Sequence, residues 1–93
     1  HERYLSMTTN LTIVRATRIL TNAGLLPSPR ITIRDNKLGR VKHNRVACIE
    51  VSAGKDADSI MSSIEAALAT AGFRVGWFHM ADGTKQTAWS TAA

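Results

Sequence analysis

The stretch RVGWFHMADGTKQTAWS, residues 74–90, predicts two strands joined by a tight turn. Asp82 and Gly83 stand between two alternating runs, and Asp-Gly is a strong signal of a two-residue type I′ turn, in which both central residues need a positive φ. Trp77 and Phe78 are neighbours in the first of these strands, so their side chains should point to opposite faces. One of the two aromatics is therefore expected in the core and the other on the opposite face of a sheet.

Counting outward from a two-residue turn assigns each residue of this hairpin to a face, since cross-strand partners share a face. One face receives Gly76, Phe78, Met80, Lys85, Thr87 and Trp89, with the Trp89 ring able to lie over the gap that Gly76 leaves. The other face receives Val75, Trp77, His79, Gln86 and Ala88, with Phe73 leading into it. We predict Phe73, Val75 and Trp77 as core, because Phe73 follows Gly72 directly. Phe78, Met80 and Trp89 are then the exposed surface.

Two amphipathic helices are expected, one ahead of each pair of strands. Apolar residues recur at spacings of three and four in both, the pattern of a helix with one buried face: Ile13, Ala16, Leu20 and Ala23 in the first, and Ile60, Met61, Ile64, Leu68 and Ala71 in the second. Thr8, Thr9 and Asn10 are the N-cap candidates of the first helix. Gly24 and Gly72 are expected just after the two helix ends.

The first pair of strands is expected at residues 30–34 and 46–51. In residues 30–34 Ile31 and Ile33 alternate with polar residues, so they should face the core while Arg30 and Arg34 face outward. The segment LTNAGL, residues 20–25, resembles LATAGF, residues 68–73, and each half of the chain gives the order helix, strand, strand.

The fold class predicted from this order is α+β. An α-β-β-α-β-β two-layer sandwich would place two helices on a mainly antiparallel four-stranded sheet, in the manner of a circularly permuted ferredoxin-like fold. Two separate hairpins, or strands shared across a dimer, are the alternatives. Residues 8–93 are expected to form one small domain with a pseudo-repeat, 8–54 and 55–93. Residues 1–7 are interpreted as the remnant of a tag, since Met7 reads as a natural start.

Positive charge is concentrated in the first half of the chain. Residues 1–54 carry nine Lys and Arg against three acids, whereas residues 55–93 carry three against four. Six of the basic residues fall between positions 30 and 45, opposed there by Asp35 alone: Arg30, Arg34, Lys37, Arg40, Lys42 and Arg45. Such a segment is typical of a surface that binds anions, above all nucleic acid, or of a solvated basic loop.

The residues that could support catalysis or bind a metal show no known arrangement. His43, His79 and Cys48 lack the short paired spacings of structural zinc sites, and Glu50 and Glu65 have no partner carboxylate nearby in the sequence. Cys48 is expected as a small apolar residue in a strand. We therefore predict no catalytic residues, no metal and no cofactor. A single cysteine and the lack of a long apolar run favour a cytoplasmic protein that is not inserted in a membrane.

Two functional hypotheses follow from the exposed aromatic residues. In the first, the chain is a small non-enzymatic interaction module that binds a protein partner or itself, as a homodimer, through Phe78, Met80 and Trp89 together with Arg30 and Arg34. In the alternative, bases stack on the aromatics while Arg30, Arg34, Lys37, Arg40, Lys42 and Arg45 hold phosphates. In a third interpretation, residues 37–45 or Tyr4 and Leu5 cover this face internally. The small, basic, Thr- and Ala-rich composition is typical of an accessory protein from a phage or mobile element.

Overall fold

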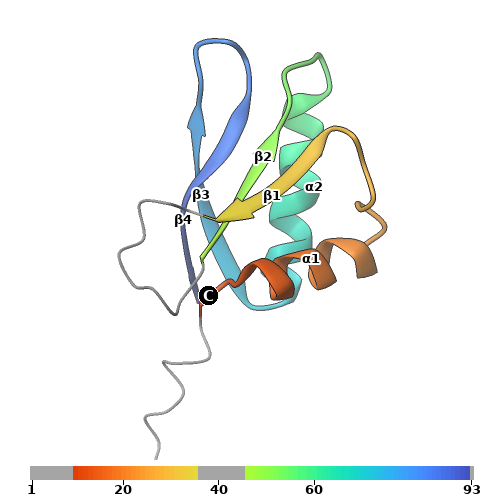
Figure 1. Ribbon diagram of the computed structural model, residues 1–93, viewed down its shortest axis with the longest axis vertical. Helices are drawn as coiled ribbons and strands as arrows, with labels where there is room; N and C mark the ends of the chain where they lie inside the picture. Colours follow the sequence, from red (N-terminus) through yellow and green to blue (C-terminus); the bar gives the residue numbers. More distant parts are fainter. Residues whose placement is uncertain (1–9, 36–45, 93) are drawn as a thin grey trace, which may run out of the picture.

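The computed structural model describes residues 10–35 and 46–92 (Figure 1). Two helices and four strands follow one another in the predicted order α-β-β-α-β-β: α1 (Ile13–Asn22), β1 (Ile31–Asp35), β2 (Ala47–Val51), α2 (Ala57–Thr70), β3 (Phe73–His79) and β4 (Lys85–Ala92). The predicted α+β class is confirmed. The basic residues Lys37, Arg40, Lys42 and Arg45, the caps Thr8 and Thr9, and Tyr4 and Leu5 lie outside the described residues.

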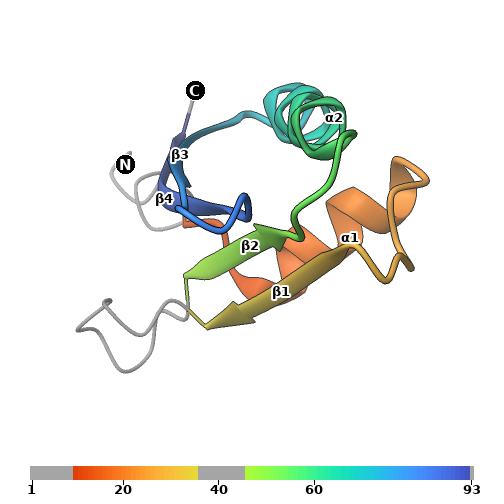
Figure 2. The same ribbon diagram turned by 90° about the horizontal axis from the view of Figure 1, so that it is seen from above.

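The four strands form one sheet in the order β1-β2-β4-β3, and every neighbouring pair is antiparallel. The last strand, β4, therefore lies between β2 and β3 in the sheet. β2 and β3 run parallel to each other, and α2 connects them along the chain. This is the split β-α-β arrangement of ferredoxin-like folds, reached here from a permuted starting point. Both helices pack on the same side of the sheet, α1 against β1 and β2, and α2 against β3 and β2 (Figure 2).

The core lies between the helices and the sheet, and the two halves of the chain fill it in equivalent ways. Ala16 and Leu20 of α1 are fully buried, and so are Ile64 and Leu68, which follow them by the same interval in α2. Each helix is followed by a glycine with a positive φ, Gly24 at 78° and Gly72 at 93°. Other fully buried side chains of the core come from the strands and the chain ahead of α1: Leu11, Ile49 and Val51.

The first helix begins later than the sequence suggested. Thr12 is its N-cap, and the Thr12 hydroxyl accepts a hydrogen bond from the Arg15 N–H at 3.1 Å. Thr12 itself is extended and forms an antiparallel bridge with Val46. The Leu11 carbonyl accepts a hydrogen bond from the Ala47 N–H at 2.8 Å, and the Leu11 side chain is buried. Pairing with the start of β2 therefore prevents Asn10 from capping the helix as predicted.

The hairpin loop also differs from the prediction. The Met80 N–H donates to the Thr84 carbonyl at 2.9 Å, so three residues form the loop rather than two. Within this loop only Gly83 has a positive φ, 92°. A type I′ turn would need a positive φ at Asp82 as well, so it is excluded. The Asp82 carboxylate accepts hydrogen bonds from the Thr84 N–H at 3.0 Å and hydroxyl at 2.7 Å. These bonds hold the pKa of Asp82 below its ordinary value.

A β-bulge in β4 compensates for the longer loop. Trp77 pairs with Thr87 and Gly76 with Trp89, so Ala88 is the extra residue. Between the loop and the bulge the register differs by one residue from the prediction: Thr87 and Lys85 lie on the helix side, and Gln86 lies on the open side. Beyond the bulge the predicted pair of Gly76 and Trp89 is correct.

Cys48 alternates with the core residues Ala47 and Ile49 along β2, and it is buried as well. Its thiol lies 3.7 Å from the Thr87 carbonyl, which it approaches as a donor. The expectation that Cys48 behaves as a small apolar residue agrees with this burial.

Candidate functional site

The face of the sheet that the helices do not cover carries an exposed group of large apolar side chains. Phe78, Met80 and Trp89, which we call the aromatic patch, are 50%, 43% and 48% exposed. On the other side, Phe73 is buried, and Val75 and Trp77 pack against the core. The prediction that Phe73, Val75 and Trp77 face the core is therefore confirmed, and so is the exposure of Phe78, Met80 and Trp89. The predicted faces of Lys85, Gln86 and Thr87 are wrong. The role of the patch in binding stays a prediction.

The Trp89 ring is fixed in place by the residue opposite it. Gly76 is its cross-strand partner, and the indole atoms Cε2, Nε1 and Cζ2 occupy the space that a side chain at position 76 would need. The ring therefore rests on the backbone of β3 while about half of its surface stays exposed. A ring held in this way loses little conformational entropy when a partner binds it.

Arg34 lies on the open face of the sheet, as the sequence predicted, and reaches a neighbour of the aromatic patch. Its guanidinium crosses β2 and donates to the Gln86 side-chain oxygen at 2.9 Å, and its Nε lies 3.5 Å from the Glu50 carboxylate. Gln86 pairs directly with Phe78 across the hairpin. Arg34, Gln86 and Phe78 thus form a continuous polar-to-apolar surface from β1 to β3.

Arg30 is used differently, because β1 begins one residue after it. Its guanidinium binds the chain between β2 and α2: Nε donates to the Ser52 hydroxyl at 2.7 Å, and one terminal nitrogen donates to the Ser52 and Ala53 carbonyls at 2.9 and 3.3 Å. The other terminal nitrogen forms an ion pair with Asp56 at 2.7 Å. This hydrogen bond holds the pKa of the Asp56 carboxyl below its ordinary value of 3.8. Arg30 is therefore a structural clamp, separate from the aromatic patch.

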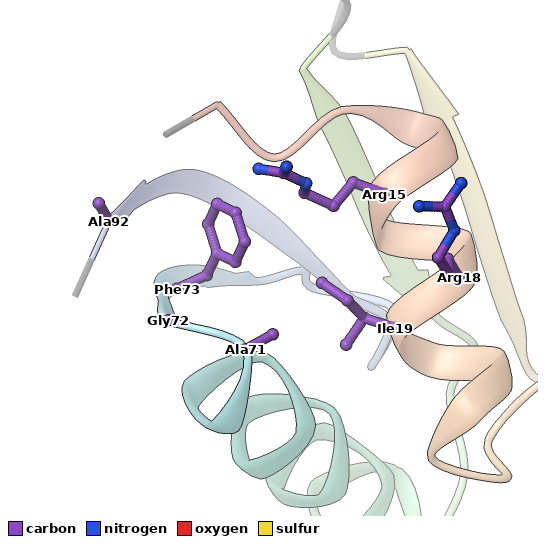
Figure 3. A pocket seen from close by; sticks show the side chains of 7 residues that line it. All are labelled: Arg15, Arg18, Ile19, Ala71, Gly72, Phe73 and Ala92. Carbon is purple, nitrogen blue, oxygen red and sulfur yellow. The ribbon is translucent and has the colours of Figure 1, made fainter. Parts of the chain in front are cut away.

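A second surface feature, which the sequence did not indicate, is a hollow of about 380 Å³ beside the end of α2 (Figure 3). Arg15 and Arg18 reach it from α1, and the Arg15 guanidinium lies 5.8 Å from the centre of the Phe73 ring. Its other lining residues are Ile19, Ala71, Gly72 and Ala92. The spacing of Arg15 and Arg18 predicts that they share one side of α1. Their position beside Gly72 depends on how α1 packs against α2, which the sequence pattern does not show.

Within residues 10–35 and 46–92, no three His, Cys, Asp or Glu side chains gather in a way that could hold a metal ion. No helix in the same ranges is both long and apolar enough to cross a membrane.

No family model, curated protein or solved structure matches this chain. The aromatic patch, with three large apolar side chains exposed on one hairpin, is the feature that supports a functional proposal.

Proposed function

We propose that this chain is a non-enzymatic binding module that docks on another protein through the aromatic patch. The observation that carries the proposal is the exposure of Phe78, Met80 and Trp89 on one hairpin, each at between 43% and 50%. Burial of a large apolar side chain is worth about 2–3 kcal/mol, so leaving three of them in water costs stability that a partner would restore. Aromatic and Met side chains on a rigid surface are typical anchors of protein interfaces.

The charges of the described residues favour a protein over a nucleic acid. Of the six basic residues in the predicted phosphate-binding set, Arg30 is held by Ser52, Ala53 and Asp56. Arg34 is paired with Glu50, which offsets its charge. On the β1 side of the patch, the charge of Arg34 is therefore balanced by Glu50. The buried, unpaired Cys48 is compatible with action in the cytoplasm, which we include in the proposal.

The test uses a double variant of the patch and a matched control. Phe78→Ala with Trp89→Ala removes both rings, whereas Val14→Ala removes an apolar side chain that is 68% exposed on α1, away from the sheet. Each protein is immobilised and used to capture partners from a nuclease-treated lysate. Proteins retained by the unmodified chain and by Val14→Ala, and lost with the double variant, support the proposal. Equal capture by all three chains contradicts it.

The same variants test the alternative hypothesis, that the aromatic patch binds nucleic acid. The chain is titrated with a mixed-sequence single-stranded oligonucleotide at about 50 mM salt and again at about 200 mM. If the nucleic-acid hypothesis holds, affinity falls steeply with salt, because each neutralised phosphate releases counterions, and the double variant binds more weakly. Absence of binding at low salt eliminates it and leaves the protein-binding proposal.

A further inference from the structure

The outer edge of β3 is available for pairing. β3 stands at the end of the sheet order, and no strand within residues 10–35 or 46–92 pairs with its outer side. Exposed strand edges usually carry Lys, Pro or a bulge that prevents association. The seven residues of β3, FRVGWFH, contain neither Lys nor Pro, and the bulge of this hairpin lies on β4 instead. Within the described residues, Arg74 is therefore the one charged side chain of this edge, and β3 also carries Phe78 of the aromatic patch.

The hydrogen bond nearest the hairpin loop shows which backbone groups of β3 point toward β4 and which point to the outer edge. The Met80 N–H donates to Thr84, so Met80 faces β4. Successive residues of an antiparallel strand direct their N–H and C=O groups to alternate sides. Residues 73, 75, 77 and 79 therefore present their N–H and C=O groups to the outer edge, in a row as long as the strand.

We propose that β3 pairs antiparallel with β3 of a second copy of this chain, about a two-fold axis at Gly76. Such an axis stands perpendicular to the sheet, so each residue must pair with one on the same face. Centring on Gly76 pairs all seven residues: Val75 with Trp77, Phe73 with His79, and Arg74 with Phe78. The two four-stranded sheets then become one of eight strands, with both aromatic patches on the same face.

The side chains are complementary in this register. On the open face Arg74 lies opposite the Phe78 ring of the other copy, a pairing that favours cation–π contact. On the helix side the partly buried Val75 and Trp77 lie opposite each other, and both already pack against the core. Gly76 has no side chain of its own at the axis, and the Trp89 ring of each copy covers it on the open face. A shift that placed Arg74 opposite its own copy would instead set like charges together, which is destabilising.

The helix side of the edge leaves room for a partner. A groove of about 210 Å³ runs between α2 and β3, lined by Glu65, Ala69, Phe73, Arg74 and Val75. It opens beside the same residues that would form the seam. Side chains of α2 therefore do not fill the space beside this part of β3 completely.

The first experiment is sedimentation of Val75→Pro against Val75→Ala. The two variants lose similar packing, but only proline removes the outward N–H, and edge strands tolerate proline where that N–H faces solvent. We expect the unmodified chain and Val75→Ala to sediment at twice the chain mass of 10.1 kDa and Val75→Pro at that mass. An unmodified chain that is monomeric at all concentrations, or a dimeric Val75→Pro, overturns the proposal. Partner capture by folded Val75→Pro would show that the aromatic patch acts independently of the edge.

The second experiment tests the register even if Val75→Pro fails to fold. A chain with both Arg74→Cys and Phe78→Cys places two cysteines opposite each other across the seam, at about 4.5 Å between α-carbons, which suits a disulfide. Mild oxidation should give a covalent dimer with the double variant and none with either single variant. A single variant that crosslinks as readily as the double one contradicts the axis at Gly76, and so does a double variant that stays monomeric.

Discussion

The indole ring of Trp89 rests on the α-carbon of Gly76, its partner across the β3–β4 hairpin. The lack of a side chain at Gly76 leaves room for the ring, because any side chain at this position would meet ring atoms of Trp89. The shape of the aromatic patch thus depends on a residue that is not itself part of it.

Gly76→Ala is expected to displace the Trp89 ring and to destabilise the protein. Overpacking of this kind costs about 1–3 kcal/mol, because the ring must leave its preferred rotamer or the strands must shift. Urea unfolding measures the loss in free energy. The indole N–H signals in an NMR spectrum should show the Trp89 resonance moving further than that of Trp77.

A double-mutant cycle provides the control for this substitution. In a chain that already carries Trp89→Ala, the added methyl group at position 76 meets no ring, so Gly76→Ala should cost much less. A coupling energy near zero between the two positions would show that the contact has no energetic consequence.

Arg30 is expected to affect stability and leave partner capture unchanged. Arg30→Ala removes hydrogen bonds to Ser52, Ala53 and Asp56, and loss of bonds to a charged group costs about 1–3 kcal/mol. Arg34→Ala is the matched control, since an exposed ion pair contributes only about 0–1 kcal/mol. Chemical denaturation of both variants checks the difference. Equal losses would mean that the clamp between β1 and the start of α2 is energetically unimportant.

The face of Trp89 could be predicted from sequence because two departures from ideal geometry cancel. The three-residue loop moves the register by one position, and the bulge at Ala88 moves it back before Trp89. Alternation along β3 alone was sufficient to separate Phe78 from Trp77. The positions between loop and bulge, Lys85 to Thr87, were assigned to the wrong faces because turn propensity does not report a bulge.

Contacts between residues far apart in sequence account for the other differences. Arg30 alternates with Arg34, which predicted a shared outer face, but its partners lie 22 to 26 residues later in the chain. The start of α1 depends on Leu11 pairing with Ala47, and the hollow beside Phe73 depends on α1 meeting α2. Local periodicity contains none of this information.

The ion pair between Arg30 and Asp56 predicts a dependence of stability on pH. Because the folded-state pKa of Asp56 is lowered from 3.8, its stabilising effect is complete above the unfolded-state pKa and is lost as the pH falls through the lowered value. The difference in unfolding free energy between the unmodified chain and Asp56→Asn should therefore shrink as the pH falls below 3.8. Denaturant titrations across that range measure it.

NMR titration of the Asp56 carboxyl identifies the cause. In Arg30→Met the charge and hydrogen bonds of the guanidinium are absent, so the pKa of Asp56 should rise toward its ordinary value of 3.8. An unchanged titration in that variant would assign the lowered pKa to the helix N-terminus instead.

Thr87 is expected to be the most sensitive polar residue of the sheet. It is 4% exposed, and its hydroxyl accepts a hydrogen bond from the Ile49 N–H at 2.9 Å, next to the bulge where β4 departs from regular pairing. Thr87→Val keeps the shape but leaves that N–H without an acceptor, which costs about 1–3 kcal/mol. Thr87→Ser keeps the acceptor and loses only a methyl group, about 1 kcal/mol. In urea unfolding, Thr87→Val should therefore have a lower free energy of unfolding than Thr87→Ser. The reverse order would show that packing, and not the hydrogen bond, joins β2 to the bulged part of β4.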